Sequence, residues 1–101
     1  MSIEKKTLKS KPVCKVKFSL SGESYINAET ICVSGEFNEW NSYSTPMKKS
    51  KSGVWSATID LETGKEYQFR YLINNQNWEN DPEADKTAPS GHGSVNSVVV
   101  V

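Results

Sequence analysis

The sequence predicts an all-β fold, a small antiparallel β-sandwich, from three observations. Apolar and polar side chains alternate with a period of two in several separate segments, as in half-buried strands. Turn-forming residues separate these segments, as in sandwiches built from short antiparallel strands. No stretch repeats apolar residues at helical spacing. A chain of 101 residues has room for one domain with a single core.

Two strands are predicted in the N-terminal half, over residues 14–20 and 30–36. The first alternates apolar side chains with lysine and serine, which places the apolar ones on one face. These side chains are Cys14, Val16, Phe18 and Leu20. In the second strand, Ile31 and Val33 share a face and Cys32 points the other way.

Three more strands are predicted in the C-terminal half, over residues 55–61, 67–73 and 95–101. The last of them is rich in valine, a β-branched residue that favours strands. In the middle one, Arg70 falls out of phase with its aromatic neighbours, so we expect its side chain to face away from the core.

Basic residues are concentrated at the N-terminus. Six of the twelve lie in the first 17 positions, against one acidic residue, Glu4. We expect residues 1–11 to form a basic, flexible arm and residues 12–101 to form a single domain. The arm is either solvated or docks on an acidic partner. It contains no apolar stretch long enough for a secretory signal, so the sequence predicts a cytoplasmic protein.

Composition argues against several classes of function. The formal net charge is zero, which disfavours a nucleic-acid partner because phosphate contacts need excess positive charge. The longest apolar run, residues 98–101, is far shorter than the roughly 20 residues that span a bilayer, so no membrane partner is expected. Two cysteines are too few for a disulfide framework, and we expect both to be reduced. With a single histidine they cannot complete a zinc site, so no metal or other cofactor is expected.

The sequence offers no group of residues typical of an enzyme. His92, the one histidine, lies between two glycines without a nucleophile elbow. Residues 81–85 begin like a calcium loop, but Lys86 stands where glycine is required and His92 where a glutamate is required. Nothing selects a pair of carboxylates for glycoside hydrolysis. We therefore expect a protein that is not an enzyme.

The ten aromatic residues divide into two groups. Trp55 and Phe69 alternate with aliphatic residues and are expected in the core, whereas Trp40 and Trp78 lie among asparagine and glutamate in predicted loops. Flat apolar faces of sugars stack on exposed indole rings, and amides or arginine hydrogen-bond the hydroxyls at the ring edge. The pair therefore predicts a carbohydrate platform. Single-stranded nucleic acid stacks on such rings as well, but the zero net charge disfavours it.

Residues 33–40, with the sequence VSGEFNEW, resemble the signature of family 48 carbohydrate-binding modules. That family includes the glycogen-binding domain of AMP-activated protein kinase β subunits and the N-terminal domains of isoamylases and glycogen branching enzymes. Further matches follow in order at residues 46–47, 53–61 and 64–71, at Trp78 with Asp81 and Pro82, and at residues 93–99. The resemblance covers residues 13–101. It implies an immunoglobulin-like early-set antiparallel β-sandwich of about seven strands that binds α-1,4-linked glucans such as glycogen, starch or maltodextrin.

The resemblance also implies a set of carbohydrate-binding residues. Two tryptophans of the family clamp glucose rings, and Trp40 and Trp78 match them. Arg70 falls at the position of a lysine and Asn96 at that of an asparagine, both of which hydrogen-bond the sugar. Ser94 matches a neighbouring threonine.

Two departures from the family pattern leave a second reading open. His92 stands where a leucine threads through the sugar ring, so the apolar plug is replaced by an imidazole that can still stack. Residues 74–76 replace a tight Asp-Gly hairpin with a loop one residue longer, which affects how Trp78 is presented. The alternative is an adaptor module of the same fold that has lost sugar binding and packs against a protein partner, such as an α-glucan-active enzyme.

Overall fold

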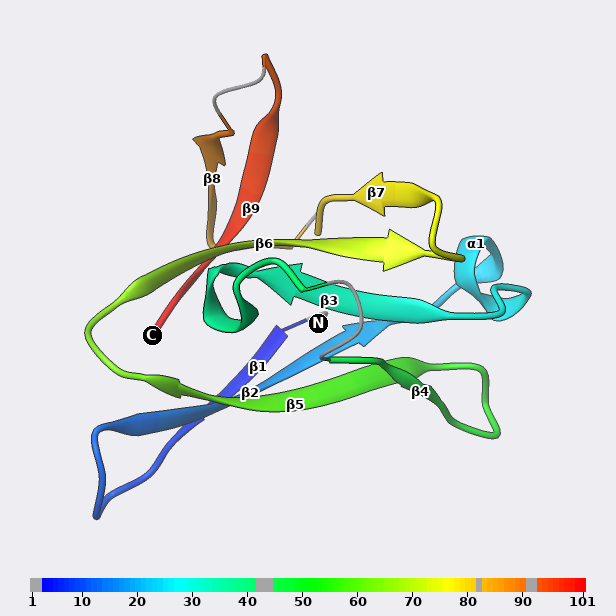
Figure 1. Ribbon diagram of the computed structural model, residues 1–101. Helices are drawn as coiled ribbons and strands as arrows, with labels where there is room; N and C mark the ends of the chain where they lie inside the picture. The colour runs from blue at the N-terminus through cyan, green and yellow to red at the C-terminus, as the bar shows by residue number, and fades with distance from the viewer. Residues whose placement is uncertain (1–2, 42–44, 82, 91–92) are drawn as a thin grey trace.

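The protein is a sandwich of two antiparallel sheets that pack face to face (Figure 1). The computed structural model describes residues 3–41, 45–81, 83–90 and 93–101. Over these residues, the first sheet has the strand order β1-β2-β5-β4, and the second has the order β3-β6-β9-β8 with β7 also paired to β6. The predicted all-β sandwich is therefore confirmed.

Five strands correspond to those that the alternation predicted. Their bounds are β2 Val13–Leu20, β3 Ile31–Gly35, β5 Trp55–Glu62, β6 Glu66–Ile73 and β9 Val95–Val100. The other described strands are short: β1 Ile3–Thr7, β4 Lys48–Lys49, β7 Asn77–Glu79 and β8 Lys86–Pro89. Two short helical turns complete the chain, α1 Glu23–Ile26 and the 3₁₀ turn η1 Glu36–Asn38. Neither these turns nor any other described segment is a helix long and apolar enough to cross a membrane.

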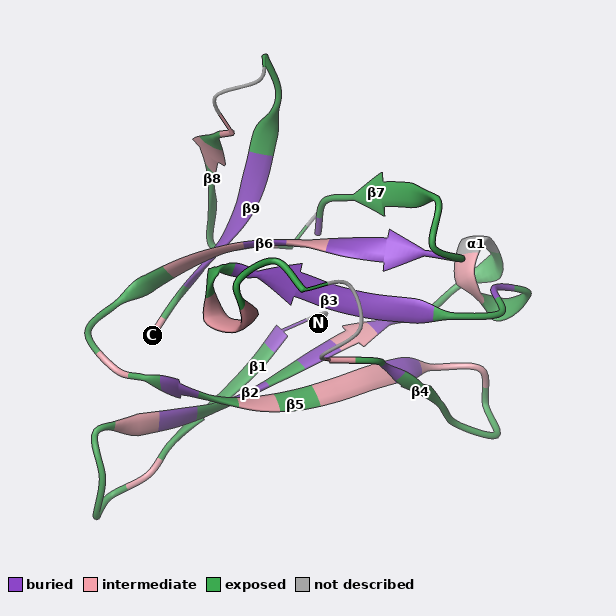
Figure 2. Ribbon diagram, viewed as in Figure 1, coloured by how far each residue is buried: buried purple, intermediate pink, exposed green. Residues whose placement is uncertain are grey.

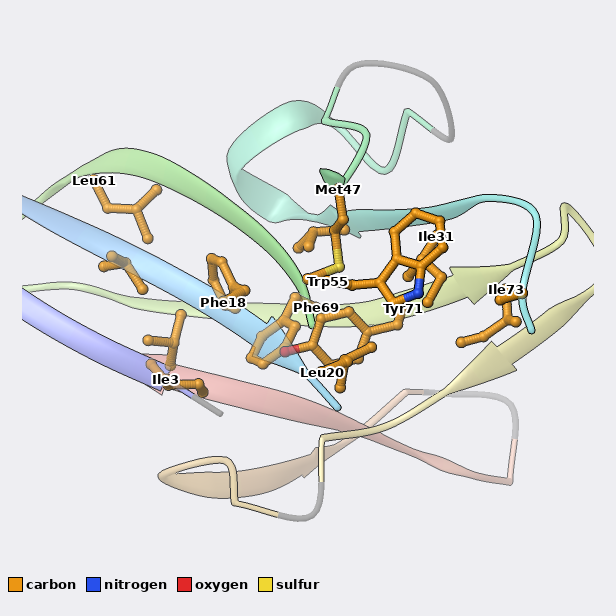
Figure 3. Close-up of a cluster of buried hydrophobic side chains, with 14 of the residues drawn as sticks. Ile3, Phe18, Leu20, Ile31, Met47, Trp55, Leu61, Phe69, Tyr71 and Ile73 are labelled. Carbon is orange, nitrogen blue, oxygen red and sulfur yellow. The ribbon is translucent and has the colours of Figure 1, made fainter. Parts of the chain in front are cut away.

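The core lies between the sheets and is built from the side chains that the alternation placed inward (Figures 2 and 3). The ring of Phe18, on β2, lies 5.0 Å from that of Phe69 and 6.4 Å from that of Tyr71, both on β6. All three rings are fully buried, and their edge-on arrangement is a favoured one. Trp55 is buried as well, and its indole N–H donates to Tyr25 O at 2.9 Å. The prediction that Trp55 and Phe69 are core residues is confirmed.

The two cysteines are free thiols, as predicted, and the structure shows that both are buried. Cys14 belongs to the core. Cys32 lies on the opposite, outer face of the second sheet, where it pairs with Leu72. Burial raises the pKa of the Cys32 thiol, so this group stays protonated at neutral pH.

Strand β1 occupies part of the segment that the sequence suggested as a flexible arm, residues 1–11. Ile3–Thr7 pairs with β2 along its whole length, and Ile3 is buried in the core. Lys5 has the same inward phase as Ile3, and its ammonium group reaches Asp85, just before β8 of the other sheet. The alternation gave no sign of this strand because it buries a single apolar side chain.

Asp85 joins the two sheets at this edge. Its Oδ2 accepts hydrogen bonds from Lys5 Nζ at 2.6 Å and from Val100 N at 2.7 Å. Burial alone raises the pKa of the carboxyl, but the bonds from Lys5 and Val100 outweigh it, and the pKa lies below its ordinary value. Such a carboxylate stabilises the fold above its unfolded-state pKa, and the contribution is lost as the pH falls through the folded-state pKa.

Asp85→Asn is expected to lower the free energy of unfolding by about 0.5–1 kcal/mol at neutral pH. The loss should shrink as the pH is lowered toward 2, because the carboxyl becomes protonated first in the unfolded state and then in the folded state. Urea midpoints at the two pH values measure the difference. Asp60→Asn is the control, since Asp60 pairs with Lys15 at 3.8 Å and its side chain is 59% exposed. An equal loss at both pH values would contradict this electrostatic account.

Candidate functional site

A groove of about 480 Å³ lies on the outer face of the second sheet, over β6. One edge of β6 pairs with β3. Along the other edge, residues 66–69 pair with β9 and residues 71–73 with β7, so Arg70 lies where the partner strand changes. In Figure 1, β7 and β9 accordingly lie on the same side of β6. The groove is lined by Glu36, Trp40, Gln68, Arg70, Trp78, Ser90, Ser94 and Asn96.

Trp40 is held at the groove by the turn that follows β3. Gly35 packs against β6 so closely that a Cβ there would lie 2.4 Å from Gln68 O. The Asn38 side chain closes the turn, because its Oδ1 accepts from Gly35 N and its Nδ2 donates to Val33 O, each at 3.0 Å. Trp40 N then donates to Gly35 O at 2.8 Å. The signature motif thus shapes the turn that presents this indole.

The backbone at Glu39 and Trp40 is left-handed, with φ of 57° and 59°. Residues other than glycine rarely adopt this region, and they persist in it where the surrounding structure holds them. Here Phe37, two residues before Glu39, supplies an anchor, since its ring lies 5.9 Å from that of Phe18 in the core. The Trp40 side chain is left 37% exposed.

Trp78 lies across β6 from Trp40, in β7, where it pairs with Leu72. It is 45% exposed. The sequence predicted a loop here, but residues 77–79 form a strand. A strand of three residues with a single apolar side chain is too short to show an alternating pattern. The three-residue connection before it is well suited to asparagine, since Asn74 and Asn75 have φ of 53° and 58°. Asn74 Oδ1 also accepts from the backbone N–H of Glu29 at 2.7 Å.

Two tyrosine hydroxyls fix the chain just after Trp78. Tyr25 donates to Glu79 Oε1 at 3.2 Å, and Tyr71 donates to the buried Asp81 Oδ2 at 2.6 Å. Burial and the facing carboxylate raise the pKa of each phenol above its ordinary value. Both therefore remain protonated and act as donors at neutral pH.

Arg70 faces the groove and away from the core, as its phase predicted. Its Nη2 donates to Ser94 Oγ at 2.8 Å and to Val95 O at 2.7 Å. Ser94 Oγ also lies 2.9 Å from Ser90 Oγ, across the hairpin between β8 and β9. The guanidinium is thus fixed to this hairpin through one of its nitrogens, and its planar fork of donors is oriented for a ligand.

Three polar side chains connect β9 to η1 along the floor of the groove. Asn96 Nδ2 donates to Gln68 Oε1 at 2.9 Å, and the backbone N–H of Gln68 donates to Glu36 Oε1 at 2.7 Å. Asn96 is only 8% exposed. These bonds hold amide and carboxylate groups in defined orientations, as recognition of hydroxyl groups requires.

The fold brings five of the six predicted site residues together: Trp40, Arg70, Trp78, Ser94 and Asn96 all line the groove. His92 lies outside the described residues. Sequence reasoning missed three lining residues, Glu36, Gln68 and Ser90. Gln68 shares the outward phase of Arg70 and Glu36 lies within the signature motif, so both carried a signal, whereas Ser90 depended on the register of the hairpin.

The chemistry of the groove suits binding. Two exposed indole rings stand beside one cationic group, amides and hydroxyls. Across the part of the chain that the structure describes, no three histidine, cysteine, aspartate or glutamate side chains are grouped so that they could hold a metal ion.

Comparison with known proteins gives a family and several relatives. A family model of the glycogen recognition site of AMP-activated protein kinase matches residues 16–101. The 1,4-α-glucan branching enzyme GlgB of Aquifex aeolicus is 38% identical over 77 residues, which cover 68% of this chain and 12% of the enzyme. GlgB of Photobacterium profundum is 43% identical over 44 residues, 43% of this chain and 6% of that enzyme. The AA13 family lytic polysaccharide monooxygenase A of Aspergillus terreus is 24% identical over 98 residues, covering 79% of this chain and 24% of that protein.

Proposed function

Because the chain belongs to the family of the glycogen recognition site of AMP-activated protein kinase, we propose that the groove between Trp40 and Trp78 is its α-glucan-binding site. The family resemblance stated from the sequence is confirmed, and with it the assignment as a non-catalytic module that binds α-1,4-linked glucans. The residues that bind the sugar are the proposal: Trp40 and Trp78 as stacking platforms, with Arg70, Asn96 and Ser94 as polar contacts.

One observation carries this proposal: two exposed indoles from opposite sides of β6 line the same groove as a row of oriented polar groups. Exposed apolar side chains that lie together and are rimmed by polar groups mark ligand-binding grooves, whereas single exposed ones are common. Here the turn after β3 and the strand β7 hold both rings at the surface. A sugar has the complementary surface, with C–H groups on its faces for stacking and hydroxyls at its edge for hydrogen bonds.

The polar groups fit hydroxyl recognition. The amide of Asn96 has two donors and an acceptor, and its contact with Gln68 uses one donor. Arg70 has five N–H donors, and its bonds to Ser94 and Val95 come from a single nitrogen, Nη2. Each residue can thus bind a hydroxyl without giving up the bonds that position it.

We infer the role of the chain beyond sugar binding from its relatives. The chain spans 12% and 6% of the two branching enzymes described above, and the whole enzymes' activity is not assigned to it. We infer a cytoplasmic module that catalyses no reaction itself and brings a glucan-active protein partner to its polymer. Two buried free thiols fit a reducing compartment.

Titration with maltoheptaose tests the proposed site. Tryptophan fluorescence should change in a saturable way, with a dissociation constant in the micromolar to millimolar range, roughly −8 to −4 kcal/mol. Cellohexaose, whose β-1,4 linkages give a straighter chain, serves as the control ligand and should bind more weakly. No change in emission at millimolar maltoheptaose would contradict the proposal. Failure to bind an amylose column, together with a stoichiometric protein partner, would favour the adaptor reading instead.

A further inference from the structure

The second sheet changes partner strands directly beside the groove. Strand β7 pairs with β6 over three residues only, and β9 takes over the same edge of β6 on the far side of Arg70. Such a short strand has few ladder hydrogen bonds to hold it. Trp78 lies in the middle of β7, so its position depends on what else fastens this strand.

Besides the two tyrosine hydroxyls that hold Glu79 and Asp81, a side chain outside the groove, Asn80, fastens this strand to β9. Its Oδ1 accepts hydrogen bonds from Ser97 N and from Ser97 Oγ, each at 2.9 Å. Its Nδ2 donates to Val95 O at 2.9 Å. Asn80 therefore ties the end of β7 to β9 through three bonds, two residues after Trp78.

The Val95 carbonyl is shared between the two sides of the groove. It accepts from Asn80 Nδ2 on the β7 side and from Arg70 Nη2 at 2.7 Å on the β6 side. The guanidinium of Arg70 therefore binds the same oxygen atom as Asn80, which follows the strand that carries Trp78. Their relative position is set at this point of β9.

The fastening is anchored in the core. Ser97 is fully buried, and its Oγ accepts from the backbone N–H of Asp81 at 2.7 Å. The Asp81 carboxylate in turn accepts from the fully buried Tyr71 at 2.6 Å. A connected polar network of this kind is rigid when its members are satisfied.

We propose that Asn80 is a positioning residue for glucan binding, which rests on the function proposed above. It is not among the residues that line the groove, and it acts by holding Trp78 at a fixed separation from Arg70, Ser94 and Asn96. The indole and the polar groups can then contact the same sugar simultaneously. The ligand does not have to order β7 when it binds, which would cost free energy of binding.

Asn80→Ala is expected to raise the dissociation constant for maltoheptaose five- to tenfold. In the ligand-free protein it should also make the Trp78 indole N–H more mobile in ¹⁵N relaxation measurements. Asn77→Ala is the matched control, since Asn77 is an exposed asparagine of β7, on the other side of Trp78 from Asn80, and it should change affinity less than twofold. Asn80→Asp keeps both acceptors for Ser97 but replaces the donor to Val95 with a carboxylate oxygen that the Val95 carbonyl repels, so it provides a second variant with at least the same expected loss of affinity.

Asn80 variants with affinity within twofold of the wild type, or with a Trp78 indole as ordered as in the wild type, would overturn the proposal. The indole measurement needs no ligand. A wild-type protein that does not bind maltoheptaose would therefore contradict the proposed function. The relaxation data would still decide whether Asn80 orders Trp78.

Discussion

Replacing Trp78 with alanine is expected to weaken maltoheptaose binding by ten- to a hundredfold, and Trp40→Ala should have an effect of the same size. Stacking of a flat ring on an aromatic side chain contributes about 1–3 kcal/mol, and 1.4 kcal/mol corresponds to about tenfold in affinity. The remaining polar groups cannot compensate, because hydrogen bonds to sugar hydroxyls replace bonds that water already makes.

Calorimetric titration of each variant measures this effect, and the melting temperature checks the fold. Because Trp78 is 45% and Trp40 is 37% exposed, their truncation also removes buried indole area, so affinities are compared at a temperature well below the melting temperature of each variant. Ile26→Ala is the matched control, an apolar side chain that is 46% exposed and does not line the groove. Wild-type affinity in either tryptophan variant would remove that residue from the proposed site.

Gly35→Ala is expected to destabilise the protein by about 3 kcal/mol or more, a large effect for one methyl group. The added Cβ would lie 2.4 Å from Gln68 O and 2.8 Å from Phe69 Cβ. Both atoms belong to β6, which is paired on both edges and cannot move away without breaking its ladders. The turn that presents Trp40 should be displaced as well, so residual folded protein should bind glucan poorly.

Denaturant unfolding measures the loss, which should lower the melting temperature by about 12–24 °C in a domain of this size. Gly64→Ala is the control: nothing lies within 4 Å of a Cβ there, and only its φ of +79° opposes the change, at a cost of about 1 kcal/mol. If the two alanine variants were equally stable, close packing at Gly35 would not be the reason for its place in the motif.

The fold was predictable wherever burial imposed a repeating pattern. Strand β2 buries every second residue, and β6 buries Phe69, Tyr71 and Ile73 in the same phase, so the alternation located both strands to within a residue or two. Strands β4 and β7 bury little and are defined by their partners, so a local pattern could not reveal them. The same limit placed Trp78 in a loop, since the register of β7 against β6 is a long-range property.

The residues that line the candidate site were largely predictable from the sequence, whereas the residues that hold them in position were not. The two tryptophans in polar surroundings and the outward phase of Arg70 pointed to one surface, and the groove contains all three. Asn80 gave no such signal, because its role depends on Ser97, which lies 17 residues away in sequence and adjacent in space. Contacts between distant segments of this kind become visible only in the folded chain.

Strand β1 bears on how copies of this protein behave at high concentration. As the outermost strand of its sheet, it has a backbone edge on which another polypeptide could add a strand. Lys5 points inward from that strand to Asp85, and Lys6 lies exposed next to it. An added strand would have to desolvate these ammonium groups, which is costly. The lysines near the N-terminus therefore protect the protein against edge-to-edge aggregation.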